Sequence, residues 1–397
     1  MKFSKRKMMM CAALLPVLFS LVGCKKDPNQ IDVVFVPSRD ATALGESAKK
    51  LEPVLDKIMK DNNLPYFFKI STSTTYPAAG TALMNSQADV GFLTGTSYAQ
   101  MTVDHPGSVE VLLTAERSGF KVQTTDYKNP NNTEEGRHKQ VQAMNGEIDN
   151  YEYLAEQDTV NVANSYNSIL ISNRNHKENG VATEIKYVDD LIGKQIGIQN
   201  NTSGAGYNYP KLFLANMKNE ASRKLWFRPD SQYLNNDYIK EHGLTIVSGE
   251  PDASKGEIKG VEIKGYDAAF TEVMNENSNF AGVWGFMDIR YSNGYNKTDG
   301  KYKDDKSVFT NTYTVAMTDP IFNDTISVRS GLEQGKKDAV KLAFKTAVKQ
   351  GDVKTDGTGA NIIYNIYSHT GYSDGVDANY ENERTIYRNN KQLVLFK

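Results

Sequence analysis

Short apolar segments that alternate with one-sided helical patterns constrain the fold of this chain more than any other feature. The segments typical of strands in its first part are Ile31–Val36, Phe67–Ser71, Val90–Leu93 and Val109–Ala115. Between the first two, apolar residues from Leu44 to Ile58 recur at steps of four, three, four and three, which is one face of a helix. The alternation predicts an α/β fold in which helices cover a parallel sheet.

A second α/β unit is expected to begin near Ile185. The strands expected from this point are Gln195–Gln199, Val261–Ile263, Val283–Gly285, Thr312–Met317 and Ile326–Val328. The helices expected among and after them are Gly206–Met217, Asp267–Met274 and Leu332–Val348. The same alternation therefore continues to the end of the chain.

Residues 121–162 interrupt this alternation. The segment is polar, rich in asparagine, glutamine and charge, and poor in aliphatic residues. We interpret it as an insertion on the surface of the protein. The strand pattern resumes at Tyr166–Ser172.

The amino terminus has the pattern of an export signal. Residues 1–23 carry four positive charges, no negative ones and the apolar run Met8–Val22. The run ends in Leu21-Val22-Gly23-Cys24, which resembles the lipobox of bacterial lipoproteins, in which the cysteine receives the lipid. An ordinary signal peptide with a chance cysteine is the alternative. We expect a mature chain that starts at Cys24, has residues 24–30 as a tether and is lipid-anchored to the cell membrane outside the cytoplasm.

Composition and missing motifs exclude several function classes. The only two cysteines, Cys11 and Cys24, leave no disulfide framework or cysteine nucleophile in the body of the chain. Removal of residues 1–23 takes the formal net charge from −2 to −6, which argues against a nucleic-acid binder. The sequence contains no Walker A motif, no GxSxG motif and no HExxH motif, and its five histidines are scattered. We therefore expect no catalytic residues, no metal and no cofactor.

Hydroxyl-rich loops follow several predicted strands and lead into helices. They contain Ser38, the segment Ser71–Tyr76, the segment Gly95–Tyr98 with Thr96 and Ser97, and the segment Asn201–Gly204. Open α/β sheets bind ligands at this edge, where helix N-termini offer free N–H groups. Such loops suit a small oxyanion such as a phosphoryl group. Each of these residues, taken alone, is as readily an ordinary helix cap.

Five short sequence motifs resemble those of a known family. They are Leu191–Gly197 with Asn201–Gly204 and Tyr209-Pro210, then Tyr76–Ala79 with Gln87–Leu93 and Ser97-Tyr98, then Gly265–Ala269, then Pro320–Asp324 with Val328-Arg329, and the tail Tyr367–Gly371 with Asp377–Tyr380. They resemble the motifs of the phosphate/phosphite/phosphonate-binding (PhnD-like) substrate-binding proteins of ABC transporters. The resemblance covers most of the body outside 121–162 and about 218–255.

The resemblance implies a two-lobed fold of the type II periplasmic-binding-protein kind, with a ligand cleft between the lobes. The first lobe would comprise residues 31–180 and 305–397, and the second lobe residues 185–300. Within the family pattern, Thr202, Ser203 and the following N–H groups would hold phosphoryl oxygens, with Asn201 and Gly204 beside them. Tyr76, Ser97 and Tyr98 would contribute from the first lobe.

One position departs from the family pattern in a way that bears on the ligand. The family motif G-H-D-A-A has a histidine where this chain has Tyr266, which donates one hydrogen bond but is not cationic at neutral pH. Asp267 and Asp288 are expected near the same edge, where a carboxylate would meet a protonated ligand oxygen or a cationic substituent. A helix cap is the alternative role for Asp267.

The resemblance and the hydroxyl loops together predict an ABC-importer substrate-binding lipoprotein. It would act as a monomer, capture a phosphate, phosphite or phosphonate anion by lobe closure, and deliver it to a permease. Tyr207, Tyr209, Trp284 and Phe286 fall near the cleft motifs, so a larger phosphate ester such as thiamine pyrophosphate is an alternative ligand. The sequence is also compatible with an enzyme on the same fold, or with a surface lipoprotein that binds no ligand.

Overall fold

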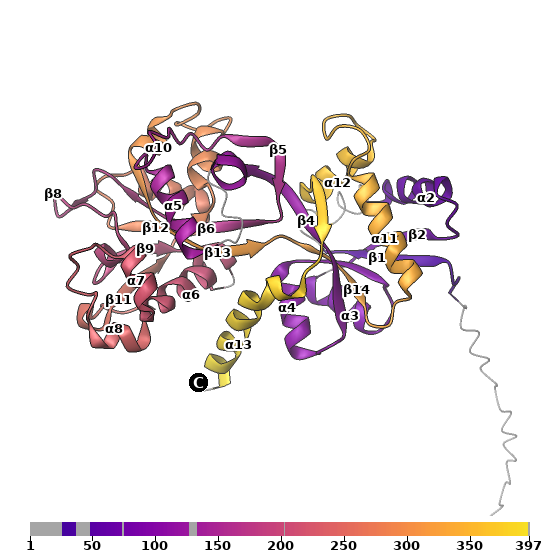
Figure 1. Ribbon diagram of the computed structural model, residues 1–397, viewed down its shortest axis with the longest axis horizontal. Coiled ribbons are helices and arrows are strands. Elements are labelled where there is room, and N and C mark those ends of the chain that lie inside the picture. Colours follow the sequence, from indigo (N-terminus) through magenta and orange to yellow (C-terminus); the bar gives the residue numbers. More distant parts are fainter. Residues whose placement is uncertain (1–25, 37–47, 74, 127–132, 202, 396–397) are drawn as a thin grey trace, which may run out of the picture.

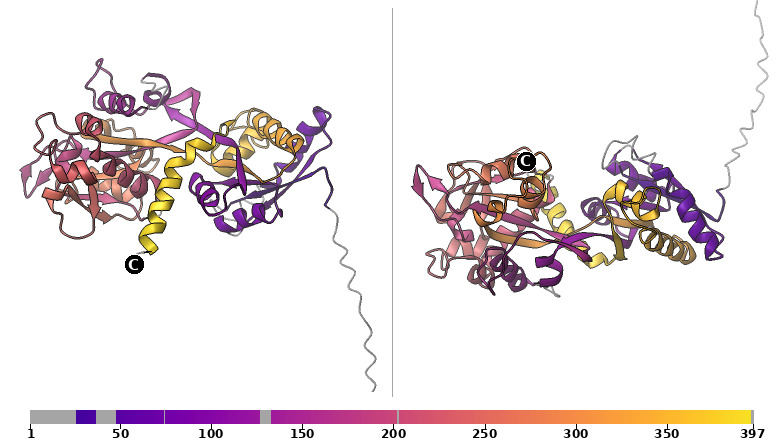
Figure 2. Two further views of the ribbon diagram at one scale, coloured as in Figure 1. Left: turned by 60° about the horizontal axis from the view of Figure 1, so that its bottom comes forward. Right: turned by 90° about the horizontal axis from the view of Figure 1, so that it is seen from above.

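The computed structural model describes residues 26–36, 48–73, 75–126, 133–201 and 203–395. Within them the chain forms two lobes, each built around its own sheet and its own hydrophobic core. Figure 1 shows the lobes side by side, with strands β4 (Val109–Phe120) and β13 (Thr312–Phe322) running between them. The two views in Figure 2 show the same separation.

The first lobe contains a mixed sheet. Its strand order is β15-β4-β14-β3-β1-β2, and β5 pairs with β4. The other strands are β1 (Gln30–Phe35), β2 (Phe67–Thr72), β3 (Val90–Leu93), β5 (Gln157–Ala163), β14 (Thr325–Arg329) and β15 (Gly371–Asp374). β1 pairs in parallel with β2 and β3, whereas β14 is antiparallel to both β3 and β4. The predicted parallel core is therefore confirmed, with antiparallel strands added beside it.

The helices that cover this sheet are α2 (Glu52–Asp61), α3 (Tyr76–Met84), α4 (Gly95–Asp104), α11 (Gln334–Ala347), α12 (Gly359–Tyr367) and α13 (Glu381–Leu395), with the short turn η7 (Asp377–Tyr380). Of these, α2 and α11 overlap the helical patterns predicted from the sequence. α2 buries Leu55 and Ile58, which lie on the predicted apolar face. α3 begins at its predicted position because Thr75 caps it, accepting a hydrogen bond from the Ala78 N–H.

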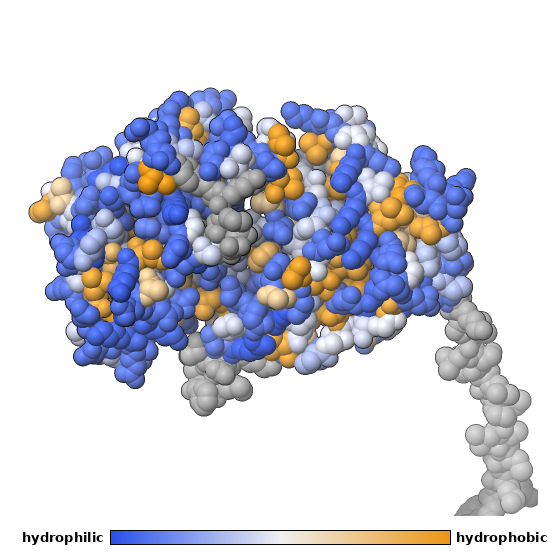
Figure 3. All heavy atoms as spheres, in the orientation of Figure 1, coloured by the Kyte–Doolittle hydropathy of each residue, from blue (hydrophilic) through white to orange (hydrophobic). Residues whose placement is uncertain are grey.

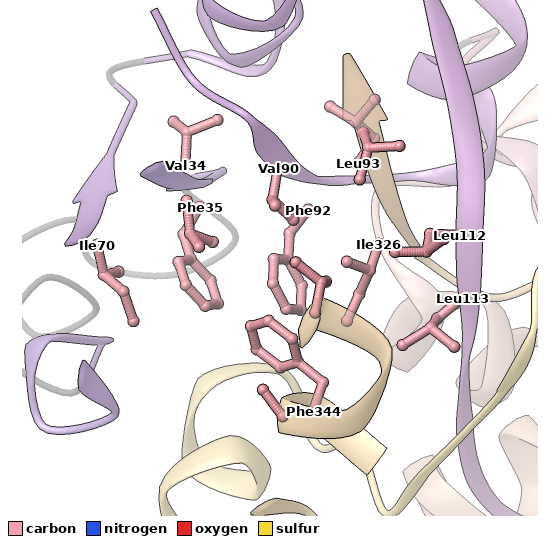
Figure 4. Close-up of a cluster of buried hydrophobic side chains, with 14 of the residues drawn as sticks. Val34, Phe35, Ile70, Val90, Phe92, Leu93, Leu112, Leu113, Ile326 and Phe344 are labelled. Atoms are coloured by element: carbon pink, nitrogen blue, oxygen red, sulfur yellow. The ribbon is translucent and has the colours of Figure 1, made fainter. Parts of the chain in front are cut away.

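Aromatic and aliphatic side chains fill the core of the first lobe. The rings of Phe35 and Phe92 stack with centroids 4.2 Å apart, and Phe344 of α11 packs edge-on against Phe92. Figure 4 shows these rings beneath the strands, with Val90 and Ile326 beside them. Burial of each large side chain of this kind contributes about 1.5–3 kcal/mol, so the strands and α11 stabilise each other.

The second lobe contains the other large sheet. Its order is β10-β11-β9-β12-β6-β13, with β6 (Ser165–Asn173), β9 (Gln195–Ile198), β10 (Thr245–Val247), β11 (Glu257–Glu262) and β12 (Gly282–Phe286). Its helices are α5 (Glu134–Met144), α6 (Tyr209–Ala215), α7 (Glu220–Trp226), α8 (Asp237–His242), α9 (Tyr266–Val273) and α10 (Ser307–Thr310). The short elements are η1 (Val122–Asp126), η2 (Val188–Leu191), η3 (Gly204–Asn208), η4 (Asn216–Lys218), η5 (Ala253–Lys255), η6 (Tyr291–Tyr295) and the hairpin β7 (Lys177–Glu178) and β8 (Val181–Ala182).

This sheet corrects the predicted lobe boundaries. β6 pairs with β12 and β13, and both β6 and β13 therefore belong to the second lobe. The prediction placed residues 163–180 and 305–322 in the first lobe, because their strand patterns follow and precede first-lobe segments along the chain. Pairing between strands that lie far apart in sequence decides the assignment instead.

The prediction that residues 121–162 form a surface insertion is also wrong. α5 packs on β13 and α7, and Val141 and Met144 belong to the core of the second lobe. The Asn145 side chain exchanges two hydrogen bonds with the backbone of Thr314, at 2.8 and 3.0 Å. Tyr153 is buried in the same core. Residues 134–153 are therefore an integral layer of the second lobe, whereas β5, at the end of the segment, pairs with β4.

The C-terminal helix α13 contacts both lobes. It packs along α4 of the first lobe, where the Tyr387 hydroxyl donates to Asp104 at 2.6 Å. Ile386 packs against a cluster that contains Tyr209 and Ile321, which lie on α6 and β13. Figure 1 shows α13, in yellow, below the junction of the lobes. In the part of the chain that the structure describes, no helix is long and apolar enough to cross a membrane.

Candidate ligand-binding cleft

Two adjoining pockets form a cleft between the lobes. Their volumes are about 350 and 570 Å³, and both are lined by Arg117, Tyr166, Gly204 and Asn323. We call the first the aromatic pocket, since its wall includes Phe120, Tyr266 and Phe286. We call the second the acidic pocket, since its wall includes Asp324 and Glu383. The four shared residues mark the junction at which the two pockets meet.

Arg117 provides a positive charge at this junction. It lies on β4, and its guanidinium donates to the Asn323 Oδ1 at 2.9 Å and to the Asp324 carboxylate at 2.6 Å. Both partners lie in the turn between β13 and β14. The hydroxyls, helix ends and N–H groups expected from the sequence did not include this guanidinium. The position of Arg117 just after the apolar run Val109–Ala115 was the available sequence signal for it.

A buried polar chain lies behind Arg117. The Asp324 carboxylate lies 3.3 Å from the Nε2 of His369, whose Nδ1 lies 3.1 Å from the Tyr372 hydroxyl. Burial lowers the pKa of His369, although Asp324 opposes this shift. Burial acts to raise the pKa of Asp324, but the hydrogen bond with His369 and the charge of Arg117 outweigh it, and this pKa is lowered. A neutral imidazole thus lies behind an Arg–carboxylate pair.

The first lobe presents hydroxyl groups at the start of α4. Thr94 caps the helix, and its Oγ1 accepts from the Ser97 N–H at 3.1 Å and donates to the Ser97 Oγ at 2.9 Å. Thr94, Thr96 and Ser97 line the acidic pocket together with Gly95. The predicted residues Thr96 and Ser97 therefore do lie in the cleft, at the N-terminus of a helix.

The second lobe presents a matching pair of hydroxyls in the aromatic pocket. The Ser203 Oγ accepts from the Gly206 N–H at 3.0 Å and lies 3.1 Å from the Tyr266 hydroxyl. Ser203, Gly204 and Tyr266, all predicted site residues, line this pocket. Burial raises the pKa of Tyr266, so its hydroxyl stays protonated and can donate. The Tyr266 ring packs edge-on against Phe286, with centroids 4.8 Å apart.

Two predicted site residues lie away from both pockets. Tyr98 is buried in the first lobe, and its hydroxyl donates to Asp377 at 2.6 Å, because the helical turn directs this side chain toward η7 rather than into the cleft. Asn201 is exposed and does not line either pocket. The prediction that they contact the ligand is not supported by these positions.

The two predicted aspartates are engaged elsewhere. Asp267 is an exposed residue that accepts from Lys297 at 2.7 Å and from Asn293 at 3.0 Å, and these hydrogen bonds lower its pKa. Asp288 is fully buried in the second lobe, paired with Arg290 at 2.7 Å and accepting from the Tyr153 hydroxyl at 3.0 Å. Neither lines the cleft, so the carboxylate expected beside the ligand is not one of these two.

Several predicted residues cannot be placed. Ser38, Thr202 and Cys24 lie outside the described residues. Tyr76 begins α3, but its side chain is not among the described ones. Two aromatic residues expected near the cleft have different positions. Trp284 packs in the core beside Phe213, whereas Phe286 lines the aromatic pocket.

The sequence did not predict that Glu383, one of the two carboxylates in the acidic pocket, belongs to the site. Glu383 of α13 lines this pocket with only 4% of its surface exposed, and Tyr209 of α6 lines it with 2% exposed. Burial raises the pKa of Glu383 to about 7, while the neighbouring Tyr209 hydroxyl acts in the opposite direction. Glu383 lies in the polar tail of the chain, where no motif or strand end marks it.

Two α/β lobes joined by crossing strands, with a polar cleft between them, define a two-lobed solute-binding protein of the type II periplasmic kind. Comparison with protein families matches residues 33–380 to the periplasmic substrate-binding proteins of phosphonate ABC transporters, and the chain belongs to this family. The resemblance and fold class expected from the sequence are thereby confirmed. No curated protein sequence matches the chain.

Several solved structures match this chain at low sequence identity. XAC2383 from Xanthomonas citri bound to chloride ion is 11% identical, with 93% of this chain and 100% of that chain covered and a TM-score of 0.50. Mh-p37 of Mycoplasma hyorhinis, described as a candidate thiamine pyrophosphate transporter, is 12% identical, with coverages of 91% and 98% and a TM-score of 0.53. PhnD1 from Prochlorococcus marinus in complex with methylphosphonate is 16% identical, with coverages of 92% and 99% and a TM-score of 0.42.

Proposed function

We propose that this protein captures a small phosphonate, phosphite or phosphate anion at the junction of the aromatic and acidic pockets. The observation that carries this proposal is the convergence of one arginine with hydroxyl groups from both lobes. Arg117 lies at the junction, the α4 hydroxyls line one side, and Ser203 and Tyr266 line the other. A tetrahedral oxyanion has enough acceptor oxygens to use donors from several directions.

The charges around the junction suit an anion of low charge. The Arg117 charge is balanced by Asp324, and the lowered pKa of His369 keeps this imidazole neutral. Most of the ligand's hydrogen bonds would then come from hydroxyl groups and the α4 N-terminus, as in other helix-end anion sites. Such a site binds by hydrogen bonding and not by a cluster of positive charges.

Ligand capture would proceed by lobe closure. Because the donors come from both lobes, an anion at the junction binds a closed arrangement more tightly than an open one and shifts the population toward it. The strands β4 and β13 that connect the lobes would act as the hinge. We propose no catalytic step, since the role of the site is binding and release.

We further propose that the protein is anchored through Cys24 and acts as a monomer. The family is periplasmic, and its members deliver ligand to the transporter's membrane-spanning subunits. The lipobox-like Leu21–Cys24 segment supports the anchor. The face in Figure 3 is covered mostly by hydrophilic residues, with hydrophobic ones in scattered groups, which supports a monomer.

A larger phosphate ester such as thiamine pyrophosphate is a second candidate ligand. The aromatic pocket supports it, because Phe120, Tyr266 and Phe286 offer ring surfaces next to the phosphoryl junction. Stacking of a heterocyclic ring against these side chains would place its phosphates near Arg117.

A thermal-shift screen of the mature chain tests the proposed function. The compounds are phosphate, phosphite, methylphosphonate, 2-aminoethylphosphonate and thiamine pyrophosphate. A ligand at 100 times its Kd stabilises the protein by about 2.7 kcal/mol. We expect a phosphonate-type ligand to raise the melting temperature, and Ser203→Ala to reduce that rise. Asp267→Asn, an exposed change on the same lobe, is the matched control. No shift with any of these anions would refute the proposal.

A further inference from the structure

The Glu383 carboxylate has no cationic partner inside the acidic pocket, as far as the described residues show. Both of its oxygens are buried, and neither has a partner in good hydrogen-bond geometry among the described residues. The hydroxyl of Tyr209, in the wall of the same pocket, lies near enough to act as a hydrogen-bond donor that opposes the rise in the pKa of Glu383, but it is not in good hydrogen-bond geometry with either oxygen. A buried polar group without a partner is rare in folded proteins.

The nearby cations are committed to other carboxylates. Arg384, the next residue along α13, pairs with Asp377 at 2.8 Å and with Glu381 at 3.3 Å. Arg117, in the wall of the same pocket, pairs with Asp324 at 2.6 Å. No ion pair therefore balances Glu383 within the described residues, and its burial costs stability. Because burial disfavours the ionised form, the same cost raises the pKa of Glu383.

The pocket itself suggests what satisfies this group. The acidic pocket has donors in one part of its wall, namely Arg117 and the α4 hydroxyls, and an unused acceptor in another part, namely Glu383. A simple anion would use the donors and leave the acceptor unsatisfied. A ligand that carries both an oxyanion and a hydrogen-bond donor would use both parts of the wall.

We propose that Glu383 determines ligand specificity by accepting a hydrogen bond from a donor on the ligand beside its phosphoryl group. This inference rests on the proposed function and narrows its substrate class. The donor has two chemical sources, an ammonium group on the substituent or a protonated phosphoryl oxygen. Either one would stabilise the ionised carboxylate, whereas a fully ionised anion without a donor would be repelled by it.

Calorimetric titration of the mature chain with two isosteric ligands tests this role. 2-Aminoethylphosphonate carries an ammonium group, and propylphosphonate has a methyl group in its place. If the donor is the ammonium group, the wild-type protein prefers the amino ligand by about tenfold or more at about pH 8, and Glu383→Gln loses most of this preference. If the donor is the protonated oxygen, wild-type affinity for propylphosphonate falls about tenfold between about pH 6 and pH 9, and Glu383→Gln flattens this dependence.

The matched control is Glu381→Gln, which changes an exposed glutamate two residues earlier on α13. It should keep the ligand preference and the pH dependence of the wild type. Unfolding curves measured for each variant confirm that it is folded. If Glu383→Gln binds both ligands as the wild type does at every pH, or weakens both equally, the specificity role is refuted while the proposed function stands. If the wild type binds neither ligand but does bind phosphate or phosphite, this inference is refuted while the proposed function stands. If it binds none of these anions, both are refuted.

Discussion

Two buried carboxylates, one in the interior of the second lobe and one in the wall of the cleft, differ in the partners that the protein gives them. Asp288 in the interior of the second lobe receives the Arg290 guanidinium and the Tyr153 hydroxyl, and all of these groups are buried. Glu383 in the wall of the cleft is almost as buried, but within the described chain it has no ion-pair partner, and neither of its oxygens has a partner in good hydrogen-bond geometry. Burial alone therefore does not distinguish the two sites.

The difference lies in which molecule supplies the partner. Around Asp288 the protein supplies every partner itself, so this site holds β12, η6 and β13 together. Around Glu383 the described residues supply no cation, and the Tyr209 hydroxyl is not in good hydrogen-bond geometry with it, which is the arrangement expected of a group that binds a ligand. A carboxylate can thus be structural or functional according to its partners, and the following variants test this distinction.

The largest effect is expected from Arg290→Met. It leaves Asp288 buried without its ion-pair partner, so the free energy of unfolding should fall by about 3–5 kcal/mol. Chemical denaturation with urea measures the loss. The double variant with Asp288→Leu removes the orphaned charge and should recover part of it. A loss below about 1 kcal/mol for the single variant would show that the interior site is not stabilised by this pair.

The next largest effect is a pH-dependent one from Glu383→Gln. The folded pKa of Glu383 is about 7, above its ordinary value of 4.5. A carboxyl whose pKa is raised on folding contributes stability below about pH 4.5 that is lost as the pH rises through about 7. The variant carries no ionisable group at this position and has no such loss. Between about pH 5 and pH 8, its free energy of unfolding should therefore rise by up to about 3 kcal/mol relative to that of the wild type.

Unfolding curves for both proteins between about pH 5 and pH 8 measure this difference. The ionisable groups that face Glu383 are Tyr166, Tyr209, Tyr380 and Arg384. Burial raises the pKa of all three tyrosines, so none of them titrates in this range. Other titrating groups are common to both proteins and cancel in the comparison. A difference that does not change with pH would mean that Glu383 is satisfied in the free protein.

A smaller effect is expected on ligand affinity from Arg117→Met. Hydrogen bonds to charged groups contribute about 1.5–3 kcal/mol, so affinity for the preferred anion should fall about tenfold to a hundredfold. Arg117→Lys keeps the charge but loses the planar fork, and we expect an intermediate loss. Calorimetric titration measures both. If Arg117→Met binds the anion with the affinity of the wild type, this arginine does not contribute to binding.

The smallest effect is expected from Tyr266→Phe. This change removes one neutral hydroxyl donor next to Ser203, and such a hydrogen bond contributes about 0.5–1.5 kcal/mol. Affinity should therefore fall less than about tenfold, while the melting temperature of the free protein changes little. Asp267→Asn, whose carboxylate is exposed, should change neither quantity. A loss equal to that of Arg117→Met would show that this hydroxyl contributes as much to ligand affinity as the charge of Arg117.

Local sequence patterns predicted the elements that begin and end at the cleft. Strands followed by hydroxyl-rich loops placed Thr96, Ser97 and Ser203 at strand ends, and each lies in a pocket wall. This worked because the carboxyl ends of neighbouring parallel strands share one edge of a sheet. The family motif added Tyr266, whose hydroxyl lies beside Ser203.

Contacts between distant segments could not be predicted in this way. Arg117, Asp324 and Glu383 are far apart in the sequence, and the return of β14 and α13 to the first lobe brings them together. α5 resembled a surface segment because its buried face includes Arg137 as well as Val141. Arg137 pairs with Asp319 of β13, a partner that lies far along the chain.

The place of β14 in the first sheet also determines the order in which the lobes can be completed. β14 separates β3 from β4, although it follows both by about two hundred residues of chain. The strands of the second sheet lie between Ser165 and Phe322, so this sheet is complete before β14 is available. A chain that is exported from the cytoplasm amino terminus first would therefore finish its second lobe while the first sheet still lacks its central strand. Until Thr325–Arg329 emerges, the pairing edges of β3 and β4 are open, and this is the period in which the protein most needs protection from aggregation.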